Sequence, residues 1–134
     1  MVFSKRQRGF TLLELVTAMT ILALLTSVGI VGYRHQTKVA REAVLKEDLF
    51  QLNHSLEQHR ADRGKYPSSI GRLRELGYLR DIPVDPMTGS RETWSQELEA
   101  QDPDNPEAEV GIFRIRSGST DVGSNGMPYN EWSY

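Results

Sequence analysis

The chain has no cysteine among its 134 residues. Without thiols it cannot form a disulfide framework, a thiolate zinc or iron–sulfur site, or a cysteine nucleophile. The lack of cysteine does not indicate the cellular compartment, because a protein without thiols is indifferent to redox potential. Apolar residues make up only 38% of the sequence, and the length allows one domain.

The chain also has little excess charge of either sign, with 16 Lys/Arg against 18 Asp/Glu. The charges are unevenly placed: residues 34–80 hold ten basic and six acidic side chains, and residues 81–134 hold three and eleven. A small basic excess beside an acidic second half, which repels phosphate, argues against a nucleic-acid partner.

Catalytic patterns are absent from the sequence. It has no nucleophile elbow, phosphate-binding loop or paired-carboxylate cleft pattern. His54 and His59 lie five residues apart, whereas a two-histidine metal site prefers a spacing of four and needs a third ligand. We therefore predict that the protein is not an enzyme.

One long apolar run is present. Residues 15–33 are nineteen uncharged residues in a row. As a helix they span roughly 28 Å, close to the ~30 Å hydrocarbon core of a bilayer. A basic cluster at residues 5–8 precedes the run and favours a cytoplasmic N-terminus. Glu14 is the one charged residue between that cluster and the end of the run.

Three interpretations of this segment compete. A cleaved signal peptide usually has an apolar region of about 7–15 residues and a small-residue cleavage site, and neither pattern is found here. A plain signal anchor leaves Glu14 unexplained. A carboxylate in a membrane helix costs about 2–3 kcal/mol at the bilayer centre, which marks it as a functional candidate. The plain alternative for Glu14 is a carboxylate that reaches out to the membrane interface.

Residues 9–14, Gly-Phe-Thr-Leu-Leu-Glu, stand between a short basic leader and an apolar helix. This arrangement resembles the class III signal of type IV pilins and pseudopilins. The resemblance implies that a prepilin peptidase cleaves between Gly9 and Phe10 and methylates the new amine of Phe10. It also implies that Glu14 pairs with the Phe10 amine of a neighbouring helix during assembly, and that the apolar helix is retained.

The match departs from the family at one position. Val31 stands where such chains commonly carry proline. Gly29 and Gly32 flank it, and each weakens a helix by about 1 kcal/mol relative to alanine. We predict that this glycine pair lets the segment stretch or unwind during assembly.

The rest of the chain predicts an α+β fold. One continuous helix is expected over residues 10–62, with an amphipathic second half. A loop and short helix follow over residues 63–90, with Ser68 or Ser69 as the helix cap. Strands are expected at residues 92–98 and 111–117, with an acidic, solvent-exposed excursion between them. The expected core stripe is formed by Leu45, Leu49, Leu52 and Leu56, widened by Val39 and Phe50.

The Gly-Lys-Tyr-Pro sequence at 64–67 and GYLRDIPVDPMTG at 77–89 extend the resemblance to the major pseudopilin of the type II secretion system. The resemblance implies a pilin-like fold, with the long transmembrane and amphipathic helix packed on a small antiparallel sheet. Residues 1–9 would be the prepilin leader and residues 10–33 the transmembrane and assembly half of the helix. Residues 34–134 would be the periplasmic globular domain, made of segments 34–62, 63–90 and 91–134.

The same resemblance implies a structural role. The chain would be a single-pass inner-membrane protein that polymerises with itself into a periplasmic filament and drives protein export across the outer membrane. Its implied partners are minor pseudopilins, the prepilin peptidase and the inner-membrane assembly platform. Two alternatives remain: a type IV pilin of a surface fibre, although no disulfide closes a C-terminal loop here, and a signal-anchored periplasmic domain.

The resemblance also raises calcium as a cofactor of the C-terminal tail. Calcium prefers six to eight oxygen ligands, many of them carboxylates. Asp121 matches the first acidic ligand of the family, but the acidic run that usually follows is missing. The alternative is a tail held by glycine turns and aromatic anchors, namely Gly118, Gly123, Gly126, Tyr129, Trp132 and Tyr134.

Overall fold

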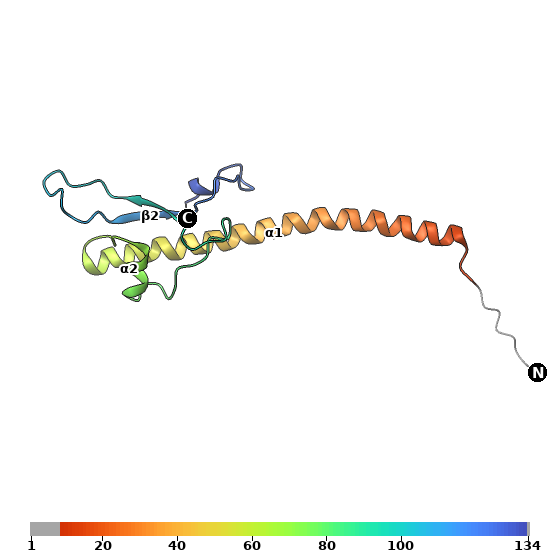
Figure 1. Cartoon of the computed structure of the whole chain (residues 1–134), viewed down its shortest axis with the longest axis horizontal. Coiled ribbons are helices and arrows are strands. Elements are labelled where there is room, and N and C mark those ends of the chain that lie inside the picture. Colours follow the sequence, from red (N-terminus) through yellow and green to blue (C-terminus); the bar gives the residue numbers. More distant parts are fainter. Residues whose placement is uncertain (1–8, 134) are drawn as a thin grey trace, which may run out of the picture. The chain divides into compact units, whose positions relative to one another are not determined.

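The computed structural model describes residues 9–133, so the predicted leader and Tyr134 lie largely outside it. The chain divides into two units, Met1–Lys38 and Val39–Tyr134. The expected α+β class is confirmed. In order, the elements are helix α1 (Leu12–Arg63), helix α2 (Ile70–Glu75), strand β1 (Ser95–Leu98), strand β2 (Ile112–Arg116) and the 3-10 turn η1 (Tyr129–Glu131) (Figure 1).

Helix α1 is the single long element that the sequence predicts. It ends at Gly64, whose φ of 75° is a left-handed conformation that glycine adopts without strain. The Gly64 N–H donates to the Arg60 carbonyl at 2.7 Å, which closes the last turn. Val39 and Phe50, expected to widen the core stripe, are instead 43% and 49% exposed. They project from a neighbouring arc of the helix, which the rest of the domain does not cover.

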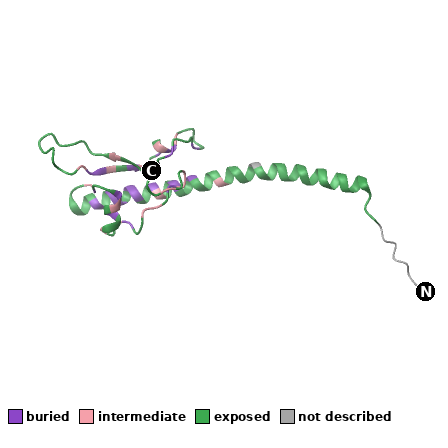
Figure 2. Ribbon diagram, in the orientation of Figure 1, coloured by how far each residue is buried: buried purple, intermediate pink, exposed green. Residues whose placement is uncertain are grey.

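The core of the Val39–Tyr134 unit is built on one face of α1 (Figure 2). The four predicted leucines are almost completely buried. Burial of each contributes about 1.5–3 kcal/mol, which explains why the remaining elements pack on this face. The side chains that cover the leucines are Ile70, Leu73, Leu79, Trp94, Ile112, Ile115, Tyr129 and Trp132.

The short helix α2 begins where the sequence predicts. Ser69 is its N-cap, and the Ser69 hydroxyl accepts a hydrogen bond from the Arg72 N–H at 3.2 Å. Ile70 and Leu73 turn inward to the core. Gly77 follows the helix with a φ of 83° and ends it.

Strands β1 and β2 are antiparallel and are shorter than predicted. A bulge between Glu97 and Leu98 interrupts their register. Trp94, expected within the first strand, lies just before it, and its indole N–H donates to the Pro83 carbonyl at 2.8 Å. A two-stranded sheet leaves a backbone edge unpaired on each side, so the inner edge of β2 needs a partner.

Asn53 of α1 is one such partner. Its Oδ1 accepts from the Ile115 N–H and its Nδ2 donates to the Ile115 carbonyl, both at 2.9 Å. Asn53 is buried, so the two bonds keep two backbone groups and one amide from being buried without partners. The long helix therefore fixes the sheet through a polar contact as well as through leucines. Sequence periodicity did not predict this contact.

A second polar side chain of α1 lies in a less favourable environment. Partial burial, followed by the negative charges of Asp85 and Glu47, raises the pKa of the Asp48 carboxyl from 3.8 to about 6. Within the described residues, the Asp48 carboxyl has no hydrogen bond or ion pair. Asp85, in contrast, is buried and accepts from the Ser117 hydroxyl at 2.7 Å and the Gly118 N–H at 3.1 Å.

The raised pKa of Asp48 predicts a pH-dependent stability. The folded state holds this proton more tightly than the unfolded state, so the group's contribution to stability falls as the pH rises from about 4 to about 6. Asp48→Asn should therefore stabilise the full chain at pH 7 by about 1–2 kcal/mol after allowance for solvent screening. Near pH 4 the variant should equal the wild type.

Thermal unfolding of both proteins in detergent, followed between pH 4 and pH 8, measures this difference. Glu92→Gln is the control, because Glu92 is an exposed carboxylate whose side chain forms no hydrogen bond or ion pair with a described residue. An Asp48→Asn variant that is less stable at pH 7 would contradict the prediction.

Candidate assembly site

The first turn of α1 is capped by a side chain that the sequence reasoning overlooked. Helix α1 begins at Leu12, two residues after the predicted start at Phe10. The Thr11 hydroxyl accepts a hydrogen bond from the Glu14 N–H at 3.3 Å, so Thr11 is the N-cap and Glu14 the third helical residue. Thr-x-x-Glu is the capping-box sequence, and that pattern was the available signal.

Glu14 lies among exposed apolar side chains. Phe10, Leu12 and Leu13 are 83%, 80% and 74% exposed, and Glu14 itself is exposed. A carboxylate in the first turn interacts favourably with the positive end of the helix dipole. When the surrounding apolar surface is removed from water, the helix dipole is not a substitute for a cationic partner of the Glu14 carboxylate. The position suits a carboxylate whose partner comes from another molecule.

The helix that follows can be buried in an apolar medium. Within the described residues, α1 is the one helix long and apolar enough to cross a membrane, and the apolar window is unburied. Its hydroxyl groups donate to carbonyls three or four residues earlier at 2.7–3.0 Å, so they enter lipid already hydrogen-bonded. These donors are Thr17, Thr20, Thr26 and Ser27.

The helical backbone continues through Gly29, Val31 and Gly32. A Cβ atom built on Gly29 or on Gly32 meets nothing within 4 Å. The glycines are therefore not required for packing inside the chain. Stretching of this segment during assembly stays a prediction.

The C-terminal tail folds back on itself and is tied to α1. An isolated bridge pairs Val122 with Pro128, and the Tyr129 N–H donates to the Asp121 carbonyl at 2.9 Å. Gly126 has a φ of 79° at the turn, as predicted. Gly118 is needed for close approach instead, because a Cβ there would lie 1.9 Å from the Thr93 carbonyl oxygen. The predicted aromatic anchors Tyr129 and Trp132 are buried.

Glu42 of α1 is the polar anchor of this tail. Its side chain is 5% exposed, and Oε1 accepts from the Ser124 N–H at 2.8 Å and from the Tyr129 hydroxyl at 2.9 Å. Oε2 is hydrogen-bonded to the Ser124 hydroxyl. Burial, followed by the bond to Glu42, raises the pKa of Tyr129 to about 12, so the phenol keeps its proton and donates at neutral pH. The hydrophobic periodicity of the sequence did not predict a role for Glu42.

The expected calcium site has one candidate side chain, Asp121, on the surface of the tail. No group of three or more His, Asp or Glu side chains within residues 9–133 is placed to hold a metal ion. Asp121 is exposed, and Glu42, a carboxylate bonded to the same tail, is engaged by Ser124 and Tyr129. Calcium binding at Asp121 stays a prediction.

The Glu42 contacts predict how the tail is held. Glu42→Gln removes charge-assisted hydrogen bonds from a buried site and should destabilise the full chain by about 1–2 kcal/mol. The measurement is the thermal unfolding of the detergent-solubilised protein, with and without a calcium chelator. Glu92→Gln, at an exposed carboxylate away from the tail, is the control. Wild-type stability with Glu42→Gln would refute the role given to Glu42. A melting temperature that falls on chelation would support calcium binding.

Comparison with known proteins identifies relatives of the chain by sequence. A family model described as the prokaryotic N-terminal methylation motif matches residues 4–30. The chain is 27% identical to type II secretion system core protein G of Pectobacterium carotovorum subsp. carotovorum, over 94% of this chain and 81% of that protein. It is 29% identical to the protein of the same name from Dickeya chrysanthemi, over 92% and 82%. It is 26% identical to the protein of the same name from Klebsiella pneumoniae, over 92% of this chain and 89% of that protein.

No solved structure matches the chain. The matches in sequence nevertheless confirm the resemblance to pseudopilins, and the methylation motif covers Gly9, Phe10 and Glu14. The motif and the exposed apolar helix together fit a membrane-anchored protein.

Proposed function

We propose that the chain is a structural subunit of a type II secretion pseudopilus and not an enzyme. A prepilin peptidase would remove residues 1–9 and methylate the amine of Phe10. The retained helix would hold the subunit in the inner membrane, with the Val39–Tyr134 unit in the periplasm. An inner-membrane platform would add subunits to a filament that also contains minor pseudopilins. The methylation motif and the similarity to core protein G support this role.

The observation that carries the proposal is the exposed Glu14 at the start of an exposed apolar helix. Such a surface is stable in lipid or in a bundle of like helices, and in either place an unpaired carboxylate is costly. The amine of a neighbouring Phe10 would be the matching charge. Two charges that are tolerable together and costly apart would fix how far one helix is displaced along the next.

Cleavage places the new amine favourably for this pairing. Phe10 lies immediately before the Thr11 cap, outside the helix. A positive amine there faces the positive end of the α1 dipole, so a nearby carboxylate offsets an unfavourable interaction. Because each subunit supplies an acid to one neighbour and an amine to another, the contact is heterologous. Repetition of such a contact produces an open helical filament, which can lengthen and push material ahead of it.

The test replaces Glu14 in the full chain. Glu14→Gln keeps the size of the side chain and removes its charge, so the helix should still insert in the membrane. Loss of one partner of a buried ion pair costs about 3–5 kcal/mol, so filament yield should fall by roughly a hundredfold or more. The readout is the amount of filament recovered from cells that express the chain with the secretion machinery.

Glu47→Gln is the matched control, because this exposed carboxylate lies on the same helix beyond the apolar half. Membrane fractionation checks that both variants insert equally. A wild-type amount of filament with Glu14→Gln would refute the role given to Glu14.

A further inference from the structure

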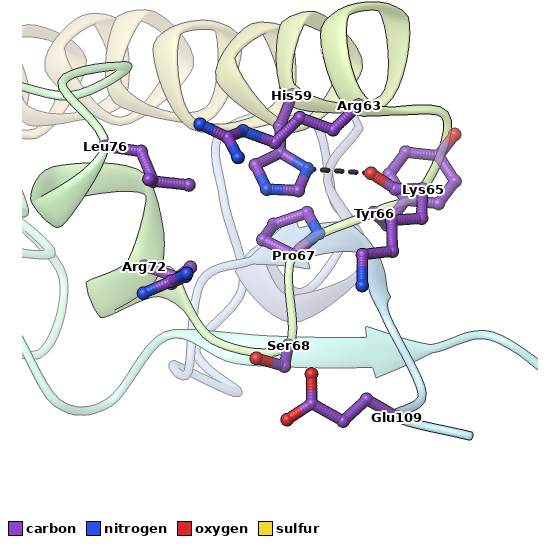
Figure 3. Close-up of a pocket in the computed structure, with 9 residues that line it drawn as sticks. All are labelled: His59, Arg63, Lys65, Tyr66, Pro67, Ser68, Arg72, Leu76 and Glu109. Atoms are coloured by element: carbon purple, nitrogen blue, oxygen red, sulfur yellow. Dashed lines mark hydrogen bonds between the residues drawn. The ribbon is translucent and has the colours of Figure 1, made fainter.

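A pocket lined by basic residues lies where α1 ends and α2 begins (Figure 3). Its volume is about 160 Å³, and Arg63, Lys65 and Arg72 contribute three cationic side chains to its wall. Glu109 is its one lining carboxylate. The buried His59 closes one side, and its Nδ1 is 2.7 Å from the Lys65 carbonyl oxygen. A carbonyl only accepts, so Nδ1 carries the proton and the ring is fixed in place.

Two of the three cationic side chains of this pocket have no acidic partner among residues 9–133. The Arg63 and Lys65 side chains are exposed and form no hydrogen bond or ion pair with any described residue. Arg72 forms an exposed ion pair with Glu75 at 3.2 Å. Nearby Arg60, by contrast, donates to the Tyr66 hydroxyl at 3.0 Å. The pocket therefore offers at least two free cations to an anionic group from outside.

A complementary segment lies on the same unit. Residues 99–109 are all exposed and contain five acidic and no basic side chains. None of these carboxylates forms an ion pair with a described residue. The segment connects β1 to β2 and returns beside the pocket at Glu109, so pocket and segment lie at the same end of the Val39–Tyr134 unit (Figure 1).

The acidic segment has a defined shape. The Asn105 N–H donates to the Asp102 carbonyl and the Ala108 N–H to the Asn105 carbonyl, both at 3.1 Å. The Asp104 N–H also bonds the Asp102 carboxyl at 2.9 Å. Prolines at 103 and 106 restrict the backbone further. A segment that is already ordered loses little conformational entropy when it binds.

We propose that the acidic segment of one copy docks on the basic pocket of the next copy in the filament. This inference rests on the proposed function, because it needs subunits held side by side with their helices parallel. Pocket and segment lie at the same end of each copy, so the segment of one copy lies within reach of the pocket of the copy beside it. The contact is heterologous, so it repeats along an open assembly in the same sense as the pairing at Glu14. Exposed charges are screened beyond about 10 Å at 0.1 M salt, so the contact acts only between adjacent copies.

Charge reversal in the full chain tests the contact. Arg63→Glu with Lys65→Glu should lower filament yield about tenfold, and so should Asp104→Lys with Glu107→Lys. Combining all four changes in one chain restores opposite charges and should restore the yield. The matched controls are Arg80→Glu and Glu92→Lys, single reversals at exposed side chains away from the pocket and the segment. Reversals that leave the yield unchanged, or that the combination fails to rescue, would overturn the inference.

Chemical cross-linking locates the contact directly. Because the chain has no cysteine, Lys65→Cys and Glu107→Cys each introduce one thiol. A short bis-maleimide reagent should give a covalent dimer in filaments that contain both variants. It should give none in filaments of either variant alone. Filaments of the mixed variants that yield no dimer would refute the docking while leaving the proposed function intact. Failure of the unmodified chain to form filaments would refute the proposed function itself.

Discussion

The leucine face of α1 is the surface on which everything after Arg63 folds. Within residues 9–133, its four leucines are covered by one short helix, one strand, Leu79 and a few aromatic side chains, and no other helix or strand packs on them. A unit with so small a core depends on the helix for its rigidity. The same helix has an apolar half whose side chains the chain leaves uncovered. Helix α1 therefore has two apolar surfaces. The leucine face is buried within the molecule, and the apolar half needs lipid or other copies of the chain to cover it.

Polar contacts from α1 add to the leucine contacts in holding the sheet and the tail on the helix. Asn53 serves as a partner for the edge of β2, and Glu42 holds the returning tail through Ser124 and Tyr129. Both are buried and both connect residues more than sixty positions apart. Hydrogen bonds of this kind add modest net stability, but a buried group left unpaired is costly, so they specify one arrangement of sheet and tail.

The parts of this account that the sequence predicted are those with a periodic or local signal. The leucine spacing predicted the buried face of α1, and the N-cap Ser69 is one of the two serines predicted to begin the short helix. Asn53 and Glu42 were not predicted, because their partners are distant in the sequence and a polar residue on a helix has no pattern that reveals its contact. Phe50 was wrongly included in the core, since its burial depends on whether a strand covers its arc of the helix. The Thr11 cap had a signal in Thr-x-x-Glu that the resemblance obscured.

The central claim is that the chain matures by losing its leader and then assembles through the exposed end of α1. Mass spectrometry of the subunit taken from assembled filaments tests this most directly. The account predicts a polypeptide that begins at Phe10 and carries one methyl group on its amine. A filament subunit that begins at Met1, or at any residue other than Phe10, would contradict it.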